Sequence, residues 1–310
     1  MCCGLDWGLC VTEWILAIEG SHTGRLVAML LALLAAVLHA VFAAMQKGRI
    51  DPWVMRGAMD ASYGLMALPF ALFVVPWPEA HLWPILAGAW AIHTVYKVLQ
   101  AMAFTRGAYT VVYPVVRGSG PFFTVIGAYL LFGEVFTVGQ WLGVAVLLCG
   151  IFGLAVYNMH TVTLERETLG LALVLALFTG FFVAFYTTYD AYGIRAAADP
   201  FTFLAWFFVI DSWSMPIVAL AHARRKGIAL ARQGLMWRAP IGGLVAMASF
   251  GAILLATRLD KVGEAAVLRE TSTIFAALIG WLFLKETVGP RRLALMALIA
   301  LGAVIVEFAG

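Results

Sequence analysis

One stretch of the sequence is written twice, and this repeat constrains the fold more than any other feature. The stretch from Thr105 to Ala155 aligns without a gap on the stretch that begins at Thr257, and the alignment places Arg117 on Arg269. Shared hydrophobicity alone would not repeat an arginine inside an apolar run. Each copy contains an apolar helix, a middle rich in Gly, Ser and Thr, an acidic turn and a second apolar helix. The sequence therefore predicts a duplicated helical unit.

The composition is typical of a membrane protein. Hydrophobic residues make up 63% of the 310 residues and charged residues only 12%, which is about half the charge of a soluble domain. The formal net charge of +3 is too small to indicate a nucleic-acid partner. The cysteines show no metal or disulfide spacing: Cys2, Cys3, Cys10 and Cys149. We expect the lipid bilayer as the environment, and neither a metal nor another cofactor.

Ten apolar windows have the length of ~20 residues that crosses a bilayer. They lie at about 26–46, 57–76, 82–103, 108–131, 137–157, 167–189, 200–221, 238–256, 262–284 and 291–309. We expect an all-α integral membrane protein with ten transmembrane helices, divided into a poorly ordered N-terminal tail (1–24) and two five-helix repeats (25–159 and 160–310). Asp51-Pro52 and Asp199-Pro200 each open the second span of their half. Because five is odd, the second repeat is inverted in the membrane, as in many secondary transporters.

The distribution of Lys and Arg predicts the orientation. Loops after the odd-numbered spans hold Lys47, Arg49, Arg56, Arg106, Arg166, Arg224, Arg225, Lys226, Arg232, Arg238, Lys285, Arg291 and Arg292, whereas the other side holds Arg25, Arg195, Arg258 and Lys261. This distribution places the loops after the odd spans in the cytoplasm and both termini outside.

In each half, an acidic turn is followed by a helix that contains glycine: Gly133-Glu134 through Gly143 and Gly150, and Lys285-Glu286 through Gly302. With these motifs and its two five-helix halves, the chain resembles the ten-helix EamA-type members of the drug/metabolite transporter superfamily, from about Arg25 to its end. The resemblance implies a multi-pass protein of the plasma (inner) membrane of a bacterium. It also implies cytoplasmic termini, opposite to the loop charges. Relatives in this superfamily export amino acids and other metabolites, or move sugar nucleotides, choline or drugs.

The polar residues of the third span all lie on one helical face. His93, Tyr96, Lys97 and Gln100 follow the spacing i, i+3, i+4 and i+7. Charged side chains inside a membrane are costly and are candidates for a functional site. This face therefore lines a cavity or meets a partner, and a purely structural network between helices is the alternative.

The fourth and ninth spans carry the duplicated arginine. In the fourth span Tyr113 and Arg117 share one face, and Pro121 predicts a kink. In the ninth span Arg269 is followed by Glu270. Adjacent helical residues point about 100° apart, so we expect these two to have different partners. Glu270 either binds a substrate or coupling cation, or neutralises Arg117 or Lys97.

The remaining carboxylates and one histidine complete the ionisable candidates. Asp60 and Asp190 lie near the ends of their spans, so we expect solvated interfacial positions for both, whereas Asp211 is deeper. His39 could carry a proton near neutral pH, and with Glu270 it is the candidate for proton coupling.

Aromatic residues near the span ends predict either ordinary packing or part of a binding site. An aromatic cage for a quaternary ammonium group needs two or three rings around one cation. Its candidates are Trp206, Trp213, Tyr189 and Tyr96, although the sequence does not bring them together.

These patterns predict a secondary active transporter. Arg117, Arg269 and Lys97 would hold an anionic group, and Asp211 or Glu270 an amino group, so an amino acid or a related amine-bearing zwitterion is the expected substrate, exported by alternating access. The sequence contains no G-x-x-x-x-G-K-[ST] loop, which favours gradients or exchange as the energy source.

Three alternatives remain. The chain could be an uptake carrier for a quaternary amine such as choline, or a lipid-flipping or scaffold subunit of a membrane assembly. An enzyme is not expected, because neither H-E-x-x-H nor G-x-S-x-G occurs. The expected partners are a small-molecule substrate and the bilayer, and the expected state is a monomer or homodimer.

Overall fold

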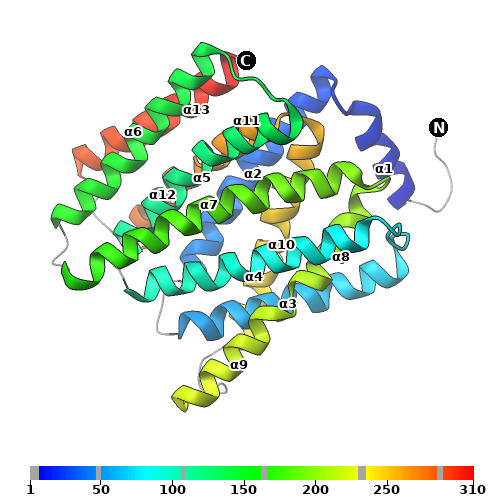
Figure 1. Cartoon of the computed structure of the whole chain (residues 1–310), viewed down its shortest axis with the longest axis horizontal. Helices are drawn as coiled ribbons and strands as arrows, with labels where there is room; N and C mark the ends of the chain where they lie inside the picture. Colours follow the sequence, from blue (N-terminus) through cyan, green and yellow to red (C-terminus); the bar gives the residue numbers. More distant parts are fainter. Residues whose placement is uncertain (1–6, 47–49, 107–108, 162–165, 230–234, 285–288) are drawn as a thin grey trace.

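The computed structural model describes residues 7–46, 50–106, 109–161, 166–229, 235–284 and 289–310. Every regular element in these ranges is a helix (Figure 1). The helices are α1 (Trp7–Ile18), α2 (His22–Gln46), α3 (Pro52–Phe73), α4 (Leu82–Arg106), α5 (Tyr109–Phe132), α6 (Val138–Thr161), α7 (Arg166–Ala196), α8 (Pro200–Asp211), α9 (Ser214–Lys226), α10 (Leu235–Leu259), α11 (Val262–Arg269), α12 (Ser272–Leu284) and α13 (Pro290–Phe308).

Several helices are suited to cross a membrane. Within the described residues, six segments are long and apolar enough to do so: His22–Met45, Val115–Phe132, Val138–Tyr157, Gly170–Ala196, Pro200–Lys226 and Leu235–Leu259. The all-helical, multi-span character expected from the sequence is confirmed. The count of ten spans and the inversion of the repeat stay predictions.

Two of the predicted spans are interrupted. The seventh span consists of α8 and α9, with Ser212 and Trp213 between them, and the ninth consists of α11 and α12, with Glu270 and Thr271 between them. By contrast, α5 continues through Pro121, where the sequence predicts a kink. The interruption in the duplicated unit therefore lies in the copy that lacks the proline.

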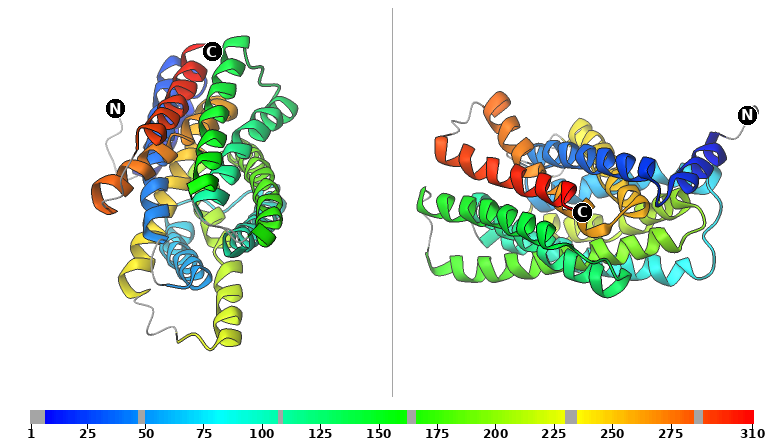
Figure 2. Two further views of the ribbon diagram at one scale, coloured as in Figure 1. Left: turned by 90° about the vertical axis from the view of Figure 1, so that its left-hand side faces the viewer. Right: turned by 90° about the horizontal axis from the view of Figure 1, so that it is seen from above.

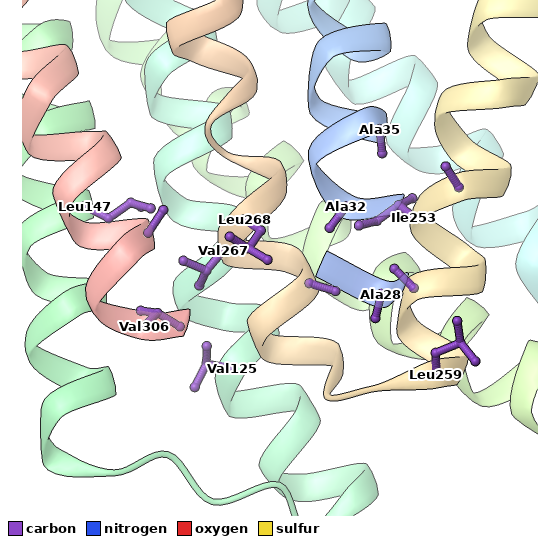
Figure 3. Packing of buried hydrophobic residues seen from close by; sticks show 14 of the residues in the cluster. Ala28, Ala32, Ala35, Val125, Leu147, Ile253, Leu259, Val267, Leu268 and Val306 are labelled. Carbon is purple, nitrogen blue, oxygen red and sulfur yellow. The ribbon is translucent and has the colours of Figure 1, made fainter. Parts of the chain in front are cut away.

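Corresponding helices of the two halves make corresponding contacts. α2 packs against α10 and α12, α7 packs against α4 and α5, and α6 pairs with α13 (Figures 1 and 2). Figure 3 shows part of the core, where Ala28, Ala32 and Ala35 of α2 lie near Ile253 of α10. Small residues permit this close approach of helices in a membrane protein.

The second span of each half begins with the same local structure. Asp51 accepts hydrogen bonds from two backbone N–H groups of α3, and Asp199 does the same for α8. In both helices proline occupies the first turn, where its missing N–H is not needed. The two Asp-Pro motifs therefore start these helices, as the sequence predicts.

Residues 7–18 correct the expectation of a poorly ordered tail, because they form α1. Ile15 and Ile18, three residues apart, are buried against the core, and Thr12 donates a 2.9 Å hydrogen bond to Asp199. Burial of this apolar face explains why the segment is ordered. Cys2 and Cys3 lie outside the described residues.

The helices alternate in direction between two ends of the molecule. One end, called the His22 end, contains the start of α2, the end of α13 and the loops 74–81, 133–137, 197–199 and 260–261. At this end Glu134 contacts Arg195 and Val262. The opposite end, where α9 finishes, is the Lys226 end. The start of α2 and the end of α13 both border one surface hollow.

Candidate functional site

A small cavity of about 70 Å³ lies between the halves, near the middle of the helices. Seven of its lining residues are aromatic: Phe42, Tyr63, Tyr96, Tyr186, Phe207, Phe208 and Phe250. Five are ionisable: His39, Arg56, His93, Asp211 and Arg269. Ala246 and Ser249 complete the wall. Helices of both halves thus enclose a cavity that combines charge with aromatic surface.

Lys97 is the centre of the first ionic cluster behind this wall. Its Nζ lies 2.6 Å from Asp60 Oδ2 and 2.7 Å from Asp211 Oδ2, and the side chain is 1% exposed. Tyr63 donates a 2.5 Å hydrogen bond to the same Asp211 oxygen, and Arg56 Nε lies 2.8 Å from Asp60 Oδ1. Two cations therefore neutralise two carboxylates away from water, which is what a buried ion pair requires.

His93 occupies the space between two carboxylates from neighbouring helices. Its Nε2 lies 2.7 Å from Asp190 Oδ2, and its Nδ1 lies 3.8 Å from Asp211 Oδ1. Asp190 is fully buried, so the imidazole supplies its polar contact. Asp211 is therefore shared between the Lys97 cluster and His93.

The duplicated arginines meet at the interruption between α11 and α12. Arg117 Nη2 lies 3.0 Å from Glu270 Oε1 and donates to Ser272 Oγ at 3.1 Å. It also reaches the backbone carbonyl of Arg269 at 3.4 Å, at the last residue of α11. Arg269 itself donates to the Tyr186 hydroxyl at 3.3 Å. Arg269 and Glu270 thus have different partners, as predicted, and Glu270 neutralises Arg117.

Several buried polar atoms of this region have no hydrogen-bond partner among the described residues. They include Asp190 Oδ1, Asp211 Oδ1, Arg269 Nε and Glu270 Oε2. Asp211 and Arg269 both line the cavity, so two of its lining residues each contain one buried polar atom without a described partner, an acceptor and a donor. Leaving such a group unsatisfied costs about 1–3 kcal/mol, and more when the group is charged. A ligand that pairs with both groups would recover this cost.

The structure brings most of the candidate residues together. His39, His93, Tyr96, Asp211 and Arg269 line the cavity. Behind them lie three of the others: Lys97, Arg117 and Glu270. Gln100 does not line the cavity, but it donates a 2.8 Å hydrogen bond to the hydroxyl of Tyr96, which does.

Other candidates lie elsewhere. Trp213 is 66% exposed, because the helix interruption after Asp211 turns it outward onto an apolar groove. Tyr189 packs over Gly88 and does not line the cavity. Trp206 contacts the rings of Trp77 and Trp83. The side chain of Tyr113 lies outside the described residues. Of the four expected cage residues, only Tyr96 borders the cavity.

The expectation for Asp60 and Asp190 was wrong. Both are buried, at 1% and 0% exposure, because each has a cationic or imidazole partner on another helix. Arg56, treated as a loop charge, is a further residue of the site, and its spacing of four residues from Asp60 is the signal that could have revealed it. Tyr186, Phe207 and Phe250 had no comparable signal.

The acidic turn of the first half does not reach the cavity. Glu134 accepts hydrogen bonds from the backbone N–H groups of Val262 at 2.9 Å and Gly263 at 3.1 Å, at the start of α11, and lies 3.4 Å from Arg195. This acid links the two halves at the His22 end. Its counterpart Glu286 lies outside the described residues.

Comparison with known proteins points to a family for the second half of the chain. Residues 170–308 match the model of the EamA-like transporter family. The chain carries an EamA-like domain. This family belongs to the drug/metabolite transporter superfamily, so the resemblance seen in the sequence is confirmed. The chain is a multi-pass membrane protein, and the family whose model it matches is one of membrane transporters and generally not of enzymes.

Two further relatives are informative. Over 77 residues the chain is 34% identical to the uncharacterized protein y4nH of Sinorhizobium fredii (strain NBRC 101917 / NGR234), a match that spans 25% of this chain and 66% of that protein. A protein of known crystal structure superimposes with a TM-score of 0.73 at 16% sequence identity, covering 93% of this chain and 97% of the other. The latter likeness supports the fold of the EamA-like chain over almost its full length.

Proposed function

We propose that this EamA-like protein is a secondary transporter that exports a small zwitterion, an amino acid or a related amine-bearing metabolite, across the plasma membrane. The proposal rests on one observation. Two residues that line the same cavity each have a buried polar atom without a hydrogen-bond partner among the described residues: Asp211 Oδ1 and Arg269 Nε. A carboxylate suits the guanidinium, and an ammonium group suits the free carboxylate oxygen. A molecule with both groups would bind Asp211 through its ammonium group and Arg269 through its carboxylate.

The charge of the buried network supports a ligand without net charge. With both histidines neutral, the four acids balance the four bases: Asp60, Asp190, Asp211 and Glu270 against Arg56, Lys97, Arg117 and Arg269. Adding a net ionic ligand to a balanced, dehydrated site is costly. A zwitterion adds one positive and one negative group and keeps the balance.

The architecture supports alternating access around this cavity. Corresponding helices of the two halves pair in the same way, which fits an inverted repeat. The interruptions α8/α9 and α11/α12 lie beside Asp211 and Arg269, respectively. Interrupted helices at the interface of two repeats are a recurrent way to build a transporter binding site.

A thermal-shift screen of the purified protein tests the proposal, because a ligand that binds only the folded state raises its apparent stability. The screen compares each amino acid with two matched analogues: its amide, which keeps only the positive charge, and its N-acetyl derivative, which keeps only the negative charge. We expect stabilisation by one or more amino acids and a much smaller effect of either analogue. Stabilisation by the N-acetyl form alone, or by no zwitterion, would refute the proposal.

A second candidate is a carrier for a quaternary amine such as choline, since seven aromatic rings line the cavity beside Asp211. Rings and one carboxylate are the chemistry that binds such cations. The variant Arg269→Gln distinguishes the two proposed functions. This variant should lose stabilisation by zwitterions if Arg269 holds a carboxylate, whereas it should keep stabilisation by choline if the arginine only balances charge.

A further inference from the structure

Building on the proposed function, we infer that His93 binds a proton that competes with the amino group of the substrate for Asp211. The protein would then exchange one proton for one zwitterion. The basis is the position of the His93 ring between two carboxylates, one of which, Asp211, also lines the substrate cavity.

The geometry requires a second proton on the ring if both carboxylates are to be satisfied. A neutral imidazole carries one N–H group, and only the protonated form carries one on each nitrogen. Nε2 lies 2.7 Å from Asp190 Oδ2, a hydrogen-bond distance, so one N–H serves Asp190. The other nitrogen, Nδ1, faces Asp211 Oδ1 at 3.8 Å, and this oxygen accepts no hydrogen bond from any described residue.

Apart from His39, no described group around His93 and the adjoining cavity is another imidazole. Aromatic rings of Tyr186, Phe207 and Phe250 enclose the imidazole, with centroids 4.4, 5.1 and 5.4 Å from its own. The titratable and charged residues around it and the adjoining cavity are His39 on α2, Arg56, Asp60 and Tyr63 on α3, Tyr96 and Lys97 on α4, Tyr186 and Asp190 on α7, Asp211 on α8 and Arg269 on α11. From α10, Ser249 and Phe250 line the cavity and neither carries a charge.

The two proton candidates from the sequence are less suited. No described carboxylate contacts His39, whose ring lies beside Phe42 with the centroids 6.1 Å apart. Glu270 Oε1 is engaged with Arg117, 3.0 Å away, and Glu270 is not among the residues that line the cavity. His93 alone among these three has a carboxylate on each side. Imidazole is also the side chain that ordinarily exchanges a proton between pH 5 and 8.

Competition follows because Asp211 has one oxygen left. Its Oδ2 already meets Lys97 Nζ at 2.7 Å and the Tyr63 hydroxyl at 2.5 Å. Oδ1 remains for the protonated His93 Nδ1 or the ammonium group of a substrate. One oxygen can accept two hydrogen bonds, but two positive groups at this oxygen would repel each other strongly in a dehydrated site. When the ammonium group binds Oδ1, Nδ1 releases its proton to solvent and Nε2 keeps its N–H toward Asp190. The substrate is chemically unchanged.

The exchange has an electrical consequence. The protonated, empty network carries one positive charge more than the balanced network, whereas the network with a bound zwitterion stays balanced. Each cycle therefore moves one positive charge across the membrane in the direction opposite to that of the zwitterion. Both a pH gradient and a membrane potential would then drive transport.

Proton release during binding tests the inference. The purified protein, in detergent and weak buffer with a pH indicator, is titrated with an amino acid that stabilises it in the thermal-shift screen. We expect about one proton released per bound ligand in the acidic range, and a dissociation constant that rises about tenfold for each pH unit below the midpoint. His93→Gln should bind the ligand, release no proton and show a dissociation constant independent of pH. The matched control is His81→Gln, an exposed histidine outside the site.

Each alternative result is informative. Ligand binding without proton release, release that persists in His93→Gln, or release abolished by His39→Gln instead would overturn the inference and leave the zwitterion site intact. Absence of any ligand binding would instead contradict the proposed function. If His93→Gln does not fold, Asp190→Asn serves as the second variant. It removes one carboxylate beside the imidazole, so fewer protons should be released per bound ligand at a given acidic pH, and an unchanged number would count against the inference.

Discussion

At the scale of residues, the interior depends on charges that neutralise one another. Arg117 and Glu270 are about 5% and 4% exposed as side chains, so neither charge is solvated. Such a pair contributes little net stability compared with an apolar pair, but removal of one partner leaves a buried charge without compensation. The loss of stability caused by a substitution here therefore depends on whether the remaining partner keeps its charge.

The first prediction concerns this pair. Glu270→Gln should lower the free energy of unfolding by about 3–5 kcal/mol, because Arg117 keeps its charge. The double variant Arg117→Met with Glu270→Met should recover most of that loss, since both charges are gone. Unfolding of the purified protein in mixed detergents measures both. A double variant less stable than Glu270→Gln would show that the arginine has another essential role.

How far the sequence reveals such residues depends on whether the signal is local. The face of His93 and Lys97 could be predicted because its spacing lies within one helix. The partners Asp60 and Asp190 could not, because they lie on other helices and their positions near span ends suggested solvent. Arg56 was missed because a loop charge and a buried charge look alike without the partner.

At the scale of elements, the helix ends and interruptions place the charges. The interruption after Asp211 contains Ser212 and Trp213. Pro216 in the first turn of α9 is a local signal for it, because its missing N–H cannot bond the carbonyl of Ser212. Pro121 gave a clear local signal, yet α5 is continuous there. Tertiary contacts, such as those of Lys97 with the carbonyl and carboxylate of Asp211, also stabilise the interruption between α8 and α9.

The second prediction concerns the start of α11. Glu134→Gln removes a charge that accepts two backbone N–H groups there and faces Arg195. Loss of a helix cap costs about 0.5–2 kcal/mol, so we expect a measurable fall in thermal stability. Glu79→Gln, at an exposed acid of the same end, is the control and should have little effect. Equal stability of both variants would exclude a capping role for Glu134.

The third prediction concerns the crossing of α6 and α13. A methyl group at Gly302 would lie 2.4 Å from the backbone nitrogen of Leu147 and 2.6 Å from the carbonyl oxygen of Gly143. Because backbone atoms cannot rotate away, Gly302→Ala should destabilise the protein by about 1–3 kcal/mol. Gly170→Ala, where nothing lies within 4 Å of the new methyl group, should be neutral or stabilising. Similar stabilities of the two variants would contradict the close crossing.

At the scale of the whole molecule, the two ends differ. At the His22 end Glu134 meets α11, and Arg195 donates to the carbonyls of Thr257 at 2.9 Å and Asp260 at 2.7 Å. The Glu134 contact joins the halves across that end, whereas the Arg195 contacts connect helices of the second half. Arg56 lies in the first turns of α3, toward the Lys226 end, and its side chain is 18% exposed, which makes this end the nearer route to the cavity.

The fourth prediction concerns orientation. If the loop charges set the topology, the Lys226 end faces the cytoplasm. In a background without the native cysteines, Glu79→Cys should react with a membrane-impermeant thiol reagent added to intact cells, and Lys226→Cys should react only after permeabilisation. Both residues are exposed, so accessibility reports the side of the membrane. The reverse pattern would establish the cytoplasmic termini that are usual in the family.

The central claim is that Asp211 and Arg269 together hold a zwitterion, and counterflow in proteoliposomes tests it most directly. Liposomes loaded with an unlabelled amino acid from the thermal-shift screen should accumulate the same labelled compound, but neither its amide nor its N-acetyl derivative. Asp211→Asn and Arg269→Gln should each weaken exchange about ten- to hundredfold, in line with about 1.5–3 kcal/mol for a hydrogen bond to a charged group. Wild-type exchange in both variants would contradict the claim.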